Sequence, residues 1–148
     1  MKKLFYSVAF LFLMCTNLFS QSIEKLKISG EELPKEYAMT KETQCKSVQA
    51  CAFYKQTDLY SSFLGKVKSK EIQNFQSKKD SGSIMYFEFE NDFDGEGFLK
   101  GLLWGSELPS KLHPEEFIAK GKFLIIYSFE KDSELKKLAQ NKQKLLLN

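Results

Sequence analysis

His113 is the only histidine of the chain and the first candidate for acid–base or metal chemistry. Glu116 follows three residues later, so on a helix the imidazole and the carboxylate would lie one turn apart. A catalytic zinc site usually takes three protein ligands, so this pair alone is incomplete. The alternative is that Pro114, Glu115 and Glu116 begin a short helix, because proline suits the first helical position and acids suit the first turn.

The acidic residues Asp92, Asp94 and Glu96 are the second candidates for metal chemistry. They alternate with other residues and are followed by Gly97, which resembles the first half of an EF-hand calcium loop. The position where such a loop has its closing bidentate glutamate is Leu103. Calcium is therefore the one cofactor that the sequence suggests. The alternative is a solvated loop whose acids precede a helix, where negative charge is stabilised.

Cys45 and Cys51 are the candidates for a disulfide. A continuous strand would place their Cα atoms about 20 Å apart, and the rise along a helix would be about 9 Å. A disulfide needs Cα atoms within about 7 Å, so bonding requires the intervening segment to turn back. Two reduced, buried thiols and a structural disulfide both stay open. A redox pair or a nucleophilic Cys51 is less favoured, because the chain has no Cys-x-x-Cys motif.

The first residues of the chain have the pattern of an export signal. A start with two lysines precedes an apolar run, Leu4 to Met14, and a more polar stretch that ends at Ser20. This run is too short to span a bilayer, which takes about 20 residues. We therefore predict a signal peptide over residues 1–20, an N-terminal arm over 21–36 and one domain over 37–148. The minor alternatives are a bacterial lipoprotein modified at Cys15 and an uncleaved anchor. Each of them leads to an exported protein, periplasmic or secreted.

The charge of the chain excludes several partners. The chain contains 22 basic residues, all lysine, against 19 acidic ones. Two of the lysines belong to the predicted signal, so the remaining domain is close to neutral and has no basic footprint for nucleic acid. The absence of arginine also excludes bidentate guanidinium recognition of phosphate or bases. We expect no transmembrane domain once the signal is removed.

Hydrophobic periodicity predicts an α+β domain. Alternating patterns favour strands over 45–54, 70–76, 83–90 and 122–130, and the second and third of these form a hairpin. Helical spacing favours helices over 57–65, 98–104, 113–121 and 133–146. This order predicts a ferredoxin-like β-α-β-β-α-β sandwich with an antiparallel sheet of four strands and an added C-terminal helix.

The absence of a coherent catalytic constellation favours a small non-enzymatic domain that binds a protein partner or a ligand. The expected contact surface is an open, aromatic sheet face around Tyr86, Glu88 and Tyr127, or the loop from Trp104 to Leu112. One alternative is a metal-dependent or thiol-dependent enzyme that uses the loop 92–96, His113 or Cys51. Another is a structural subunit of an envelope assembly, with a homodimer formed through the strongly apolar last strand.

Overall fold

The computed structural model describes residues 22–148 and contains one antiparallel sheet. The strands lie in the order β1-β2-β3-β5-β4, and every neighbouring pair is antiparallel. The predicted signal peptide, including Cys15, lies outside the described residues. The bounds of the strands are β1 Ala38–Thr40, β2 Val67–Gln76, β3 Ser81–Phe89, β4 Glu116–Lys120 and β5 Phe123–Ser128.

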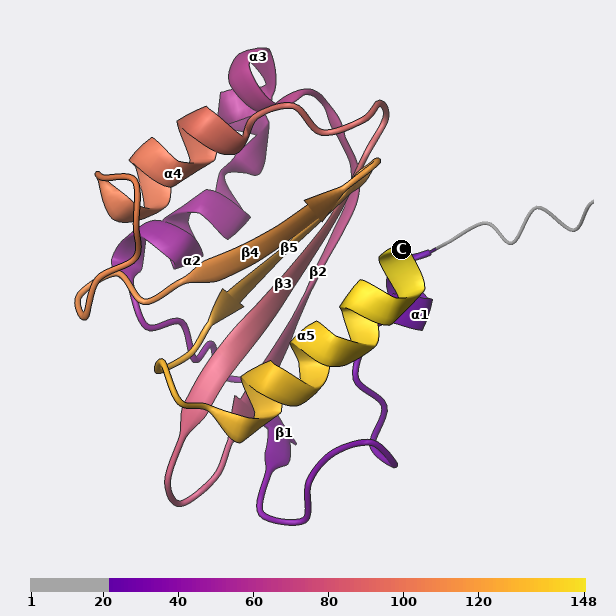
Figure 1. Cartoon of the computed structure of the whole chain (residues 1–148), viewed down its shortest axis with the longest axis vertical. Coiled ribbons are helices and arrows are strands. Elements are labelled where there is room, and N and C mark those ends of the chain that lie inside the picture. Colours follow the sequence, from indigo (N-terminus) through magenta and orange to yellow (C-terminus); the bar gives the residue numbers. More distant parts are fainter. Residues whose placement is uncertain (1–21) are drawn as a thin grey trace, which may run out of the picture.

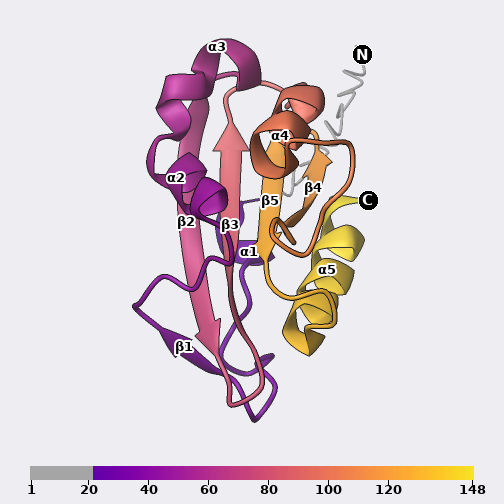
Figure 2. The same ribbon diagram turned by 90° about the vertical axis from the view of Figure 1, so that its left-hand side faces the viewer.

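Helices cover both faces of this sheet, so the domain has three layers (Figures 1 and 2). Helices α2, α3 and α4 lie on one face, which we call the helical face, and α1 and α5 lie on the other, which we call the terminal face. The helices are α1 Ile23–Leu26, α2 Val48–Lys55, the 3-10 turn η1 Thr57–Tyr60, α3 Ser61–Leu64, α4 Glu96–Trp104 and α5 Glu134–Leu147.

The helical face is closed by an aromatic core. Met85, Phe87 and Phe89 of β3 project onto this face and are buried, as the alternation predicts. The Phe87 ring packs against Phe53 of α2, with ring centroids 5.3 Å apart. The core cluster that includes these side chains is Ala50, Phe53, Leu64, Met85, Phe87, Phe89, Leu99, Leu103, Leu124 and Ile126.

The terminal face is closed by α5 and by the segment that begins with α1. The predicted N-terminal arm contributes Ile23, Leu26 and Ile28 to this core, each at most 4% exposed. Helix α1 lies beside the C-terminal end of α5 (Figure 1), where the Lys142 ammonium donates to the Lys27 carbonyl. Both ends of the described chain are therefore joined over one face of the sheet.

The α+β class, the antiparallel hairpin and the C-terminal helix are confirmed, but the topology differs from the ferredoxin-like order. The sheet has five strands, and two predicted elements are of the wrong type. Residues 48–54 form helix α2 instead of a strand, because Ser47 caps it by accepting from Ala50 N. The predicted helix at 113–121 is instead strand β4, which pairs with β5 across a turn at Gly121.

The predicted helix at 57–65 is present only in part and presents a different side to the core. It consists of η1 and α3, and it ends at Gly65, whose φ of +88° an L side chain rarely adopts. Leu59 and Phe63 are four positions apart, a spacing that predicts one buried helical side, but they are 71% and 60% exposed. Leu64 is buried instead. Side chains in a 3-10 segment repeat every 3.0 residues and not every 3.6, so residues at the α-helical spacing no longer lie on one side.

Candidate functional site

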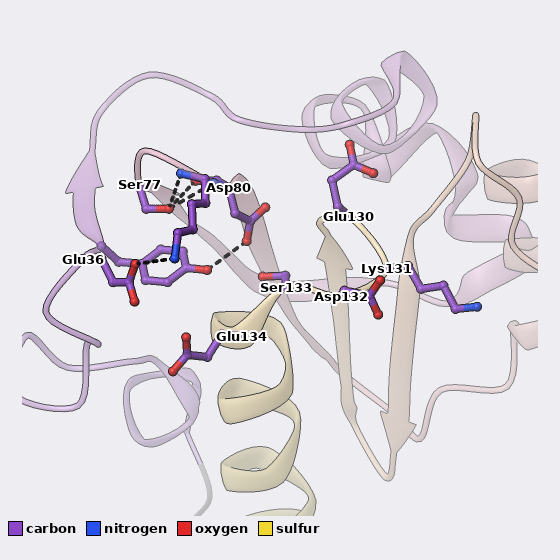
Figure 3. A pocket seen from close by; sticks show the side chains of 10 residues that line it. Glu36, Ser77, Asp80, Glu130, Lys131, Asp132, Ser133 and Glu134 are labelled. Atoms are coloured by element: carbon purple, nitrogen blue, oxygen red, sulfur yellow. Dashed lines mark hydrogen bonds and ion pairs between the residues drawn. The ribbon is translucent and has the colours of Figure 1, made fainter.

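One hollow of the described surface lies at the end of the sheet where α5 begins (Figure 3). Its volume is about 410 Å³, and three separate segments form it: the residues before β1, the β2–β3 turn and the β5–α5 connection. We call it the acidic hollow, because five of its ten lining side chains are carboxylates. Its lining residues are Glu36, Tyr37, Ser77, Lys79, Asp80, Glu130, Lys131, Asp132, Ser133 and Glu134.

Asp80 supplies the least satisfied polar group of the acidic hollow. Its Oδ2 accepts a 3.0 Å hydrogen bond from the Tyr37 hydroxyl, whereas its Oδ1 is buried and has no hydrogen-bond partner among residues 22–148. Burial raises the pKa of Tyr37, and the neighbouring Asp80 carboxylate also raises it. Tyr37 therefore remains a neutral donor at neutral pH, and it leaves the charge of Asp80 uncompensated.

The two lysines that line the acidic hollow compensate only part of its negative charge. Lys79 lies 3.8 Å from Glu36, and both side chains are largely exposed, so this pair is weak. Lys131 points away from the carboxylates in Figure 3. The positive end of α5 is already used by Ser133, which accepts from Lys136 N, and by Glu134 in the first turn. An excess of negative charge remains.

A second hollow of about 480 Å³ adjoins the first, because Glu130 and Lys131 line both. Its walls are more apolar, and it involves part of the loop that the sequence proposed as a contact surface. Leu108 is 74% exposed here. The residues that line it besides the shared pair are Leu108, Pro109, Ser110, Lys111, Pro114 and Glu116. We call it the apolar hollow.

Cys45 and Cys51 form a disulfide, with Cα atoms 5.9 Å apart. The segment before α2 turns back, so neither the extended nor the helical estimate of their separation applies. Hydrogen bonds from the loop to the sheet hold this turn. Lys46 N donates to Ser128 Oγ at 2.7 Å, and Ser47 N donates to Glu115 Oε1 at 3.0 Å. The disulfide is consistent with an oxidising compartment outside the cytoplasm.

The predicted calcium residues do not converge. Asp92, Asp94 and Glu96 are exposed, and α4 begins at Glu96, so the last acid lies in a first helical turn. Among residues 22–148 no group of three or more histidine, cysteine or acidic side chains is arranged to hold a metal ion. The three acids lie before or at the start of α4, where negative charge stabilises the N-terminus of a helix.

His113 and Trp104 lie near the loop that precedes β4. The imidazole Nδ1 of His113 is buried without a hydrogen-bond partner in the described part of the chain. Glu116, its proposed partner, instead accepts from the Lys136 ammonium at 2.6 Å.

Trp104 stacks on Phe117 with centroids 5.6 Å apart and donates its indole N–H to the Glu115 carbonyl. This indole acts as a core side chain that closes α4.

The predicted open sheet face is covered, which corrects that version of the contact surface. Tyr86 and Tyr127 are 0% exposed beneath α1 and α5. Burial raises the pKa of both tyrosines well above the usual value. Glu88 is half-buried and pairs with Lys68 at 2.8 Å. Helices α1 and α5 cover the apolar side chains that β5 presents to this face. Within one chain, neither tyrosine can therefore contact a partner protein.

Local sequence patterns do not predict the two hollows, although one part of their lining has a recognisable composition. The cluster from Lys78 to Gly82 has the composition of a turn, and in the structure its first three residues lie in the β2–β3 turn while Ser81 and Gly82 begin β3. The proximity of Asp80 to Tyr37 depends on contacts 43 residues apart, which local patterns do not encode.

Comparison with known proteins leaves the geometry as the basis for function. The chain matches no protein-family model, and no curated protein or solved structure is significantly similar to it. No helix within residues 22–148 is long and apolar enough to cross a membrane.

Proposed function

We propose that this protein is an exported, non-enzymatic binding domain whose site is the pair of adjoining hollows, and that it takes a cationic peptide segment. The observation that carries this proposal is the uncompensated Asp80 carboxylate, with a buried and unpartnered Oδ1, on the wall of the acidic hollow. A buried acceptor without a partner costs free energy, and a donor from a ligand would recover it.

The two hollows together suggest the form of the ligand. A primary ammonium suits the acidic hollow, because its five carboxylates outnumber its two lysines and attract a positive charge. The apolar hollow beside it, with Leu108, Pro109 and Pro114, suits an aliphatic neighbour of that ammonium. A lysine next to a leucine in an extended peptide meets both requirements.

Titration with a defined peptide pair tests this proposal. The probes are a capped peptide with the sequence Leu-Lys-Leu and its counterpart Leu-Glu-Leu, added to ¹⁵N-labelled protein at low ionic strength. We expect the lysine peptide to shift amide signals of Asp80, Asp132 and Leu108, and the glutamate peptide to shift none. Binding should weaken as salt is added, because the attraction is electrostatic.

Asp80→Asn is the decisive variant, because it removes the charge and keeps an acceptor for Tyr37. We expect its dissociation constant for the lysine peptide to rise about tenfold, equivalent to about 1.4 kcal/mol. Asp94→Asn is the matched control: this exposed aspartate precedes α4, at the opposite end of β3 from the hollow. Equal affinity of the two peptides, or equal effects of the two variants, would contradict the proposal.

A further inference from the structure

The Cys45–Cys51 disulfide lies on a loop that is held in place without it. The Gln44 and Lys46 amides donate to Ser83 Oγ and Ser128 Oγ, from β3 and β5, at 3.1 and 2.7 Å. The Ser47 amide donates to the Glu115 carboxylate, and Ser47 also caps α2. The hydrogen bonds of the loop therefore hold its turn independently of the sulfur atoms.

The disulfide has the features of a labile bond more than of a structural one. Both cysteines are half-buried, and the bond joins residues only six positions apart. In the chain-entropy view a short loop gives the smallest stabilisation. Disulfides that are not enclosed in a core have the higher, more oxidising potentials and are the ones that exchange.

The sulfur pair also lies near one end of a helix. Cys51 is the fourth residue of α2, a helix of eight residues, so the positive end of the helix dipole lies close to the sulfur that leaves. Side chains on a helix lean toward its N-terminus, so the sulfur pair lies at that end. Glu115, 0% exposed, accepts from Ser47 and Ser128 through Oε1, while Oε2 has no partner among residues 22–148. We treat Glu115 as a positioning residue for the loop.

We propose that Cys45–Cys51 is a reversible thiol–disulfide exchange site that oxidises a dithiol segment of another exported protein. A thiolate of that segment attacks one sulfur, the Cys45–Cys51 bond breaks, and a mixed disulfide forms while the other cysteine leaves as a thiolate. The second thiolate of the segment then attacks the mixed disulfide and closes its own bond. Two electrons pass to the domain, and the two thiol protons of the segment end on Cys45 and Cys51.

Reaction with dithiothreitol, a small dithiol, tests this under native conditions. We expect the disulfide to open at a rate proportional to the dithiothreitol concentration, and the product to keep the dispersed amide spectrum of the folded domain. A rate independent of dithiothreitol, which means that opening waits for unfolding, would overturn the proposal. Collapse of the amide spectrum on reduction would overturn it as well.

Two matched variants test the role of the loop anchors in glutathione buffers. Ser128→Ala removes the acceptor of Lys46 N, and Thr57→Val removes a buried hydroxyl that donates to Phe53 at the opposite end of α2. We expect Ser128→Ala to shift the equilibrium about fivefold toward the dithiol and Thr57→Val to leave it unchanged, because only the first loosens the loop. Equal shifts in both variants would overturn the role of the anchors.

A dithiol peptide tests the transfer itself. We expect the wild-type protein to convert a capped peptide with two cysteines to its disulfide form, with one equivalent of domain dithiol appearing in thiol labelling. Cys51→Ser should trap Cys45 in a mixed disulfide with the oxidised peptide. A peptide that stays reduced in the presence of the native disulfide would overturn the proposal, whatever the peptide titrations of the hollows show.

Discussion

The two faces of the sheet are closed by different interactions. On the helical face a series of rings runs from the sheet to the surface, in which Phe87 packs on Phe53, and Phe98 packs on both Tyr60 and Phe63. On the terminal face buried polar pairs join the layers. Tyr127 donates to Gln143 of α5, and Gln143 donates to the Leu26 carbonyl of the N-terminal segment.

This difference reflects what each face must hold. The apolar side chains of α2 and α4 pack directly against the sheet, and this packing is enough to place both helices. The N-terminal segment has little regular structure, and its carbonyl and amide groups need partners once they are buried. Gln73 provides these partners for Ile28, since it accepts from the Ile28 amide and donates to its carbonyl. Apolar packing closes both faces, and on the terminal face hydrogen bonds to the N-terminal segment are needed in addition.

The largest effect is expected from Phe87→Ala on the helical face. Phe87 is 0% exposed and contacts the rings of Phe53 and Tyr54, so truncation leaves a cavity in the aromatic core. We expect a loss of about 3–5 kcal/mol in the free energy of unfolding, measured by urea denaturation. Met39→Ala, at a 46% exposed position of edge strand β1, is the control. A loss below about 1 kcal/mol for Phe87→Ala would show that the rings are not what closes this face.

Loss of the disulfide is the next largest effect on the helical face. The double variant Cys45→Ser/Cys51→Ser should reduce the free energy of unfolding by about 2 kcal/mol, the value for a short closed loop. The domain should stay folded, because the loop anchors remain. Circular dichroism and urea denaturation measure both outcomes. Complete unfolding would show that the disulfide is the main constraint on α2.

Tyr127→Phe tests the terminal face with a change that keeps the ring. Removal of the hydroxyl leaves Gln143 Oε1 buried without its donor, so we expect a loss of about 1–2 kcal/mol in urea denaturation. Tyr54→Phe is the matched control, because the Tyr54 ring is only half-buried on the helical face. Similar losses for both variants would remove the distinction between the faces.

The smallest effect is a pH dependence that belongs to the terminal face. Burial raises the pKa of Glu116, but hydrogen bonds from Lys136 and Gln140 outweigh it, so the pKa of this carboxyl is lowered overall. A lowered pKa in the folded state gives stability that is present above pH 4.5, the ordinary value, and that is lost as the pH falls through the lower folded value.

Glu116→Gln should therefore flatten the stability profile in acid. We expect the difference between the variant and the wild type to stay below about 1 kcal/mol, because the carboxylate is partly exposed and screened by solvent. Urea denaturation at neutral pH and near pH 3 measures it. Glu88→Gln, whose partner Lys68 is largely exposed, is the control. An unchanged acid profile for Glu116→Gln would assign the pH dependence to other groups.

The elements that the sequence predicted well are those whose periodicity is long and unambiguous. The β2–β3 hairpin follows from alternation and α5 from helical spacing, and the structure adds the Ser133 cap of α5. Residues 48–54 alternate and yet form a helix, because the Ser47 cap and the hydrogen-bonded loop before it decide their conformation. Residues 116–120 follow a proline and acids that suit a helix, and pairing with β5 overrides that preference.

The candidate sites also divide into features that local sequence patterns predict and features that contacts between distant segments decide. Composition is enough to show that the domain is nearly neutral after its predicted signal, lacks arginine and is rich in aromatic residues. Contacts between distant segments cover Tyr86 and Tyr127, bring Cys45 to Cys51, and place Asp80 beside Tyr37 in a hollow. The reason is physical: composition and periodicity act over one turn or one strand, whereas burial and pairing depend on contacts between segments far apart in the chain.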